Sequence, residues 1–170
     1  MSLPRPFARP LAVVALCAAA AAAACRDLAF EPESPATVTF APELGINLSA
    51  FTQLPSGVYV QEVATGSGAV VTDSSSIRAS YRGTLANGRQ FDSATFGRDT
   101  DLRGLIPGWQ SGLAGARAGS RRRLVIPPSQ AYGNTSRPGI PAGSVLYFVI
   151  DILSVTTPVT PPPATTSARP

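Results

Sequence analysis

The sequence predicts an α+β fold in which a curled antiparallel β-sheet wraps over one short α-helix. Three observations favour it: a segment of alternating polarity that runs into an Asn-Gly dipeptide, a nine-residue apolar run near the C-terminus, and a single candidate helix between them. With 170 residues and 44% hydrophobic content, the chain is long enough for one domain of ordinary size and additional segments.

The first strong strand signal lies in residues 77–85, where apolar and polar side chains alternate. This period places the apolar side chains on one face of a half-buried strand. Asn87 and Gly88 follow the segment. The dipeptide predicts a hairpin closed by a type I′ turn, in which both central residues have a positive φ.

Two further strands are expected in the second half of the chain. Residues 124–126 form a short apolar strand that is stopped by Pro127 and Pro128, because proline has no amide hydrogen to donate to a sheet. Residues 145–153 are almost wholly apolar. That run is long enough for the central strand of a sheet that is buried against another element.

One helix is expected in the core, over residues 107–116. Pro107 suits the first turn, where an amide hydrogen has no partner in any case. Trp109, Leu113 and Ala116 supply its apolar positions. A single short helix is therefore available to cover the sheet.

The flanking segments lack the pattern of folded elements. Residues 1–24 are predicted to be a signal peptide, and residues 25–50 a tether with at most one turn of helix near the domain. Residues 51–156 form the predicted domain. Residues 157–170 are rich in proline and threonine and are predicted to be an extended, disordered tail.

The first 24 residues carry the charged-then-apolar pattern of a secretory signal. Arg5 and Arg9 precede an apolar run that is short for a membrane span of about 20 residues. Export is the simpler interpretation, and a retained membrane anchor is the alternative.

Cys25 follows three alanines, and this sequence resembles the cleavage site of a bacterial lipoprotein, where the new first cysteine is acylated. Ordinary cleavage after an Ala-x-Ala sequence is the competing interpretation. Cys17 lies inside the predicted signal, so Cys25 is the one cysteine expected in the mature chain and no internal disulfide can form. We expect an exported protein, either periplasmic or anchored by a lipidated Cys25 to a membrane of a bacterial envelope.

The composition excludes several kinds of chemistry. The chain has no histidine, which excludes Ser-His and Cys-His catalysis, histidine-ligated zinc and imidazole general bases. We expect no metal, no cofactor and no nucleic-acid partner. The three consecutive arginines at 121–123 have no aromatic residues between them, which is typical of a solvated strand entry and not of a nucleic-acid-binding patch.

Six short motifs between residues 81 and 148 occur in an order and spacing that resembles the FKBP-type peptidyl-prolyl cis-trans isomerase domain. Each motif is weak alone, but the ordered set spans the predicted domain and neither flank. The motifs are Tyr81-Arg-Gly, Asn87-Gly-Arg-Gln-Phe-Asp-Ser, Leu105-Ile-Pro-Gly-Trp, Ala131-Tyr-Gly, Pro138-Gly-Ile-Pro and Leu146-Tyr-Phe. The resemblance implies the same fold, a sheet wrapped over a helix.

The resemblance also implies an aromatic pocket. In this family a tryptophan at the start of the helix forms the floor, aromatic side chains form the walls, and polar or backbone groups hold the ligand. The implied catalytic residues are Tyr81, Phe91, Asp92, Trp109, Tyr132 and Phe148, and the implied substrate-binding residues are Leu105, Ile106 and Ile140. From composition alone, Trp109, Phe91 and Phe148 are better explained as plain core, and only their joint placement in the motifs favours a site. Asp92 is equally compatible with a turn that satisfies backbone amides.

The implied activity is rotation about Xaa-Pro bonds in exported, partly folded polypeptides, carried out by a monomer without covalent chemistry. The rival interpretation is a catalytically weak FKBP-type chaperone or binding module for Pro-containing segments. It is motivated by Thr100, which stands where the family usually has a phenylalanine, and by the short stretch from Ala94 to Arg103. In that case one pocket wall is thinner, or Phe96 supplies it.

Overall fold

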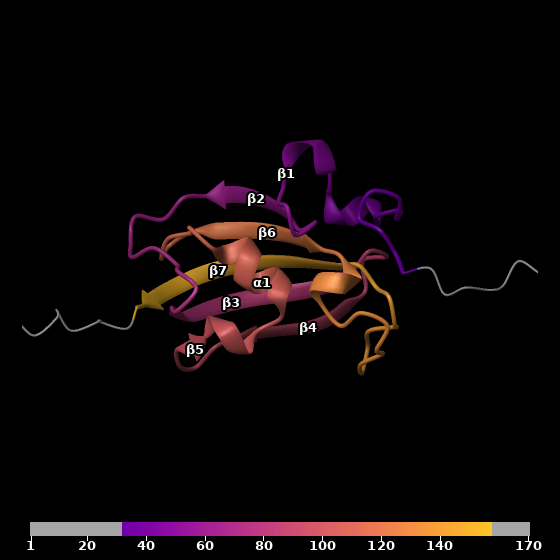
Figure 1. Ribbon diagram of the computed structural model, residues 1–170. Helices are drawn as coiled ribbons and strands as arrows, with labels where there is room; N and C mark the ends of the chain where they lie inside the picture. Colours follow the sequence, from indigo (N-terminus) through magenta and orange to yellow (C-terminus); the bar gives the residue numbers. More distant parts are fainter. Residues whose placement is uncertain (1–31, 158–170) are drawn as a thin grey trace, which may run out of the picture. The chain divides into compact units, whose positions relative to one another are not determined.

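The computed structural model describes residues 32–157, which form one antiparallel sheet of seven strands around a short helix (Figure 1). The strand order is β1-β2-β6-β7-β3-β4, and β5 pairs with β3. The strands are β1 (Thr52–Gln53), β2 (Tyr59–Ala64), β3 (Ser76–Leu85), β4 (Gln90–Thr95), β5 (Thr100–Asp101), β6 (Arg121–Ile126) and β7 (Leu146–Thr156). The helices are α1 (Pro107–Leu113) and the 3-10 turns η1 (Pro42–Leu44), η2 (Leu48–Ala50), η3 (Leu102–Gly104) and η4 (Pro128–Gln130). The predicted α+β fold is confirmed.

Strand β7 lies in the middle of the sheet, between β6 and β3. The apolar run predicted to be a central strand is therefore confirmed, and the strand continues to Thr156. Phe148, Ile150 and Ile152 point to the concave face and belong to the main core. Tyr147, one position along, belongs to a second apolar cluster on the opposite face.

The predicted hairpin joins β3 to β4, but its turn is not of type I′. Gly88 has a φ of 82°, whereas no residue other than glycine has a positive φ between 32 and 157. The Gly88 amide donates to the Leu85 carbonyl at 3.0 Å, and the Leu85 amide donates to the Arg89 carbonyl at 2.9 Å. This is a type I turn followed by a left-handed glycine, the three-residue connection. The Asn87-Gly88 dipeptide predicted the position of the turn correctly. Its type differs because the pairing of β3 with β4 leaves a connection of three residues between them.

Helix α1 begins at Pro107 as predicted and ends at Leu113, three residues earlier than expected. It packs closely against β6. A Cβ atom on Gly108 would lie 2.3 Å from Ile126 Cγ2, and one on Gly112 would lie 2.8 Å from Leu124 Cδ1. The two glycines are four residues apart and so lie on one helix face, which lets the backbone approach the sheet.

Strand β6 ends before Pro127 as predicted, but the arginines at its start are not a solvated entry. Arg122 is largely buried; it pairs with Glu62 and donates to the Gly112 carbonyl at 2.9 Å and the Ala114 carbonyl at 3.0 Å. Its guanidinium thus satisfies backbone groups at the C-terminal end of α1. The prediction was wrong because these partners are distant in sequence. Arg121, which pairs with Asp151 at 2.6 Å, remains half exposed.

The segment before β1, predicted as part of a tether, is attached to the domain at Glu33, whose amide donates to the Gly143 carbonyl at 2.9 Å, and it packs on the convex face of the sheet from Val38 onward. Arg123 stacks over the rings of Phe51 and Tyr147 and donates to the carbonyls of Leu44, at 2.8 Å, and Gly45, at 3.0 Å. The apolar residues that meet the sheet here are Val38, Phe40, Leu44, Ile46 and Leu48. They lie in irregular chain or in the single turns η1 and η2, which are too short to show a helical or strand period.

The predicted signal peptide, Cys25 and residues 158–170 lie outside the described residues. Within residues 32–157, no helix is long and apolar enough to span a membrane.

The contact between α1 and β6 leads to a stability prediction. Gly108→Ala should destabilise the domain by about 1–3 kcal/mol, because overpacking against Ile126 outweighs the gain of about 1 kcal/mol in helix propensity. Gly97→Ala is the matched control, since a Cβ there meets no atom within 4 Å, and it should change stability by less than about 0.5 kcal/mol. Urea unfolding measures both; equal effects would contradict the close packing.

Candidate functional site

A cavity of about 280 Å³ opens on the concave side of the sheet, between α1, β3, β4 and β7. Ten residues line it: Tyr81, Phe91, Asp92, Phe96, Gly104, Leu105, Ile106, Trp109, Tyr132 and Phe148. Eight of the nine residues implied by the sequence are among them. The ninth, Ile140, lines an adjoining hollow.

The floor of the cavity is Trp109, which is only 4% exposed. Its indole ring meets the rings of Tyr81 and Phe148 edge to face, with centroids 5.2 and 5.4 Å apart and interplanar angles of 88° and 85°. Aromatic pairs favour this geometry because a positive ring edge meets a negative ring face. Perpendicular rings fix one another as walls and floor and leave open space between them.

Gly83 on β3 allows two of the walls to meet. A Cβ at this position would lie 2.6 Å from the Phe91 ring and 2.8 Å from the Phe148 ring. Those two rings lie 5.6 Å apart at 88°, directly over the glycine. Any larger side chain here would displace a wall of the cavity.

Phe96 completes the wall that Thr100 leaves open. Its ring lies 5.5 Å from that of Tyr81 and 6.1 Å from that of Trp109. Thr100 itself lies in β5 opposite Ile77 and does not line the cavity. The sequence suggested Phe96 only as an alternative; Gly104 was missed, and no sequence signal marked it.

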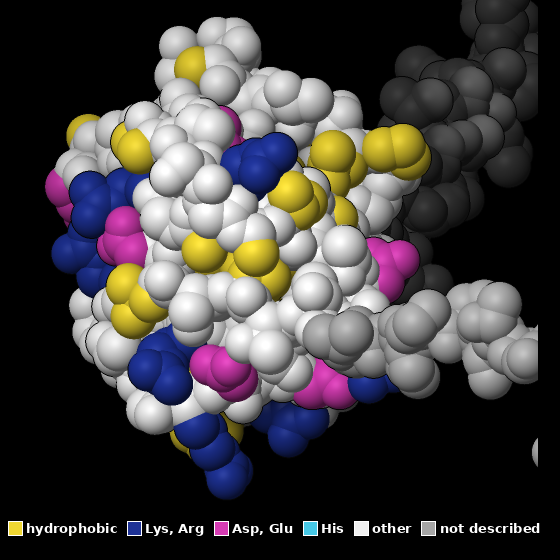
Figure 2. Space-filling model, turned by 90° about the vertical axis from the view of Figure 1, so that its left-hand side faces the viewer, with side chains coloured by type: hydrophobic (Ala, Val, Ile, Leu, Met, Phe, Trp, Pro, Cys, Tyr) yellow, Lys and Arg dark blue, Asp and Glu magenta, His cyan; other side chains and the backbone are white. Residues whose placement is uncertain are grey.

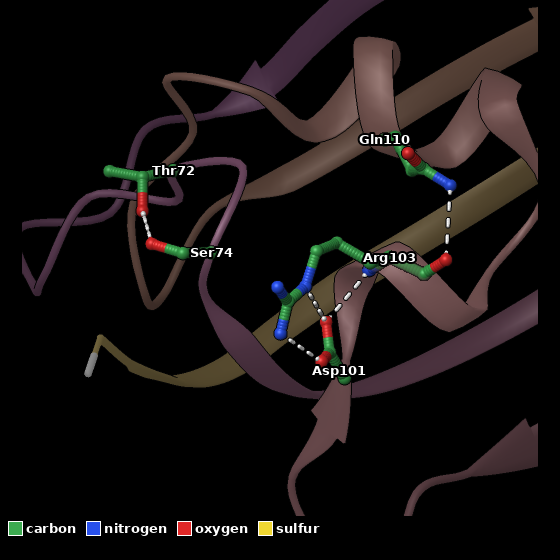
Figure 3. Close-up of polar contacts among 5 residues, drawn as sticks. All are labelled: Thr72, Ser74, Asp101, Arg103 and Gln110. Atoms are coloured by element: carbon green, nitrogen blue, oxygen red, sulfur yellow. Dashed lines mark hydrogen bonds and ion pairs between the residues drawn. The ribbon is translucent and has the colours of Figure 1, made fainter.

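Gly104, Leu105 and Ile106 form one edge of the cavity. Polar contacts around η3, which ends in this edge, connect it to α1 (Figure 3). Asp101 Oδ1 accepts a hydrogen bond from the Arg103 amide at 2.9 Å, which caps η3. The hydrogen bond from the Arg103 side chain lowers the pKa of the Asp101 carboxyl. The Gln110 side chain donates to the carbonyls of Leu105, at 2.8 Å, and Arg103, at 3.4 Å, and so ties this edge to the helix that carries the floor.

The rim carries the polar groups. The Tyr81 hydroxyl donates to Asp92 Oδ2 at 2.6 Å, across the β3–β4 hairpin. Burial, followed by this hydrogen bond, raises the pKa of Tyr81 above its ordinary value near 10, so the phenol stays protonated. In the described part of the chain, the Ile106 amide donates to no backbone carbonyl.

A second hollow of about 310 Å³ adjoins the cavity and shares Phe91, Asp92 and Tyr132 with it. Its other lining residues are Arg137, Pro138 and Ile140. The Arg137 guanidinium lies 5.6 Å from the centroid of the Tyr132 ring, a cation–π contact. The two hollows form a continuous site, with an apolar floor and a charged far end.

The lining of this site is mainly apolar and aromatic. Residues 32–157 hold no cluster of three or more His, Cys, Asp or Glu side chains that could ligate a metal, and the chain has no histidine. An apolar floor with a few polar groups at its rim suits one apolar side chain of a peptide. Fold and site thus define a class: a curled sheet over a short helix, with an aromatic pocket between them.

Comparison with known families gives the same class. Residues 68–153 match the model of the FKBP-type peptidyl-prolyl cis-trans isomerase family, and the chain belongs to that family. It is 40% identical over 119 residues to the FKBP-type peptidyl-prolyl cis-trans isomerase FkpA of Escherichia coli K12, a match that covers 68% of this chain and 42% of FkpA. It is 39% identical over 108 residues to FK506-binding protein 4 of Mycosarcoma maydis, covering 61% of this chain and 29% of that protein. The chain therefore spans less than half the length of these curated relatives.

Solved structures agree with the fold. The crystal structure of FkpA from Escherichia coli superposes with a TM-score of 0.60 at 33% identity, over 68% of this chain and 55% of FkpA. The crystal structure of AtFKBP13 gives 0.55 at 30% identity, over 62% of this chain and 98% of that protein.

The contact between Tyr81 and Asp92 predicts a pH dependence. The folded state raises the pKa of Tyr81, so this stabilisation is fully present below pH 10 and is lost as pH rises through the folded pKa. Above pH 10, the free energy of unfolding should therefore fall more steeply for the unaltered protein than for Tyr81→Phe. Urea unfolding at pH 8 to 11 measures this, and parallel profiles would show that the phenol is not perturbed.

Proposed function

We propose that this chain is a peptidyl-prolyl cis-trans isomerase that accelerates rotation about Xaa-Pro bonds by holding proline in its aromatic cavity. The observation that carries the proposal is the convergence of Tyr81, Phe91, Phe96 and Phe148 around Trp109, with an open space between them. Family membership supports it. The substrates are Pro-containing segments of unfolded or partly folded polypeptides, and the protein acts as a monomer.

The mechanism follows from the electronic structure of the amide. Resonance gives the C–N bond partial double-bond character and a rotation barrier of about 18–20 kcal/mol. The planar amide is more charge-separated than the twisted transition state, so water stabilises the planar form more. Transfer of the amide into a water-poor aromatic cavity raises the ground state relative to the transition state and lowers the barrier. No proton transfer or covalent step is required.

Different lining residues hold the proline ring and the substrate carbonyl. Trp109 and the aromatic walls hold the pyrrolidine ring, and Leu105 and Ile106 border it. The Ile106 amide and the Tyr132 hydroxyl are donors for a substrate carbonyl. With the ring held on one side and the carbonyl on the other, rotation occurs about the bond between them. Ile140, in the adjoining hollow, contacts residues that flank the proline.

A further part of the proposal concerns location. The pattern of residues 1–24 supports export, and Cys25 after three alanines supports acylation and a lipid anchor. The protein would then act on chains in a bacterial envelope.

Activity is tested with the full chain and an Ala-Xaa-Pro-Phe peptide. Phe91→Ala opens one wall to water and should lower kcat/KM about tenfold, which corresponds to about 1.4 kcal/mol of transition-state stabilisation. Phe40→Ala is the matched control, because Phe40 is also a half-buried phenylalanine but packs on the convex face. It should leave kcat/KM unchanged. If the unaltered chain gives only the uncatalysed rate, the proposed activity is wrong.

The same variants separate the enzyme from the rival binding module. A binding module that lacks useful turnover would still hold an unfolded client after Phe91→Ala, and its suppression of client aggregation would persist. For the proposed isomerase, refolding of a client limited by proline isomerisation should slow with the loss of peptide activity.

Lipidation is tested in a bacterial host fed radiolabelled palmitate. The unaltered chain should incorporate label and fractionate with membranes, whereas Cys25→Ser should do neither, because serine has no thiol to acylate. Label retained in Cys25→Ser, or absent from both chains, would refute acylation at this residue.

A further inference from the structure

We infer that the chain's own proline-rich segment, residues 158–163, occupies the aromatic cavity and competes with substrates. This inference rests on the proposed function, since it takes the cavity to bind prolyl peptides. The observations that carry it are the place where β7 leaves the domain, the distance from there to the cavity, and the proline content of the following residues.

The C-terminal end of β7 lies beside a wall of the cavity. Thr156 Oγ1 donates to Asp99 Oδ2 at 2.7 Å. Asp99 lies in the loop between β4 and β5, three residues after Phe96, which lines the cavity. In Figure 1 the arrowhead of β7 and strand β5 lie at the same end of the sheet. The chain therefore leaves the domain next to the loop that supplies this wall.

The prolines lie at a suitable distance from this exit. Pro161 is four residues beyond Thr157 and Pro163 is six, which correspond to reaches of about 12 and 19 Å in a polyproline II conformation. Three extended residues separate Asp99 from Phe96, a span of at most about 11 Å. Pro161 to Pro163 can therefore reach the cavity, whereas Pro158 is too close to the end of β7 to do so.

Chemistry and linkage favour this occupant. Consecutive prolines have few conformations to lose on binding, so docking costs little entropy. A ligand on a short tether has an effective concentration of about 1 mM. Within the described residues, the apolar segment from Val38 to Phe51 packs on the convex face of the sheet, away from the cavity.

The test compares the full chain with a variant that carries Pro161→Ala, Pro162→Ala and Pro163→Ala. The matched control is Thr165→Ala, Thr166→Ala and Ser167→Ala, which makes the same number of changes in the same segment but removes no proline. Trp109 is the only tryptophan in the chain and forms the cavity floor, so acrylamide quenching of its fluorescence reports occupancy without any turnover.

The proline variant should show stronger quenching and a several-fold higher kcat/KM, as expected for a tethered competitor whose effective concentration of about 1 mM exceeds its Kd. Its kcat should be unchanged, and the control should match the unaltered chain. Unchanged quenching in the proline variant overturns the inference. An effect that disappears on dilution also overturns it, because the occupant is then the segment of a second copy.

Failure of this inference is distinguishable from failure of the proposed function. If all three chains catalyse equally and quench equally, only the internal competitor is wrong. If none of them catalyses, the proposed activity is wrong, and the quenching comparison still decides whether the cavity is occupied.

Discussion

The close contact between a two-turn helix and the middle of the sheet determines where everything else in the site can lie. Gly108 and Gly112 let the backbone of α1 approach Ile126 and Leu124. Trp109 lies between these glycines in α1, so the close packing of the helix also fixes the position of the buried indole ring against the concave face of the sheet. So short a helix has little stability of its own, and Arg122 supplies hydrogen bonds to the carbonyls at its C-terminal end. The floor of the cavity is thus positioned by backbone packing and a buried guanidinium.

The cavity is a region of the core that its own side chains do not fill. Interiors normally pack without voids, so an open space among aromatic rings needs something that prevents collapse. Here the rings brace one another edge to face, and the Tyr81 hydroxyl is held outward by Asp92 at the rim. Gly83 lets Phe91 and Phe148 meet without closing the gap. The edge-to-face contacts that hold the aromatic walls rigid also keep them apart. A rigid apolar cavity of this kind can exclude water without closing around its ligand.

The sequence predicted those features that depend on local pattern. Three elements could be predicted from their own residues alone. The alternating polarity of residues 77–85 predicts β3, the prolines after residue 126 predict the end of β6, and the apolar run 145–153 predicts β7. At the start of β6 the prediction failed because the contacts there lie outside the local pattern. Arg122 and Arg123 looked solvated because Glu62, Gly112 and Leu44 are not near them in the chain. For the site, the ordered motifs indicated which residues converge, but only the structure shows that Phe96 supplies the wall absent at Thr100.

The division of the site into floor and rim has a consequence for selectivity. Under the proposed function every substrate presents the same proline ring, so the apolar floor and walls would not distinguish one prolyl peptide from another. Discrimination would then come from groups that meet the neighbouring residues. In the adjoining hollow these include the apolar Ile140 and two charged side chains, Asp92 between the two hollows and Arg137 at the far end. The arginines on the face in Figure 2 lie among acidic side chains and form no single basic field. Long-range attraction therefore contributes little on that face, and the choice among peptides depends on the few side chains at the rim of the cavity.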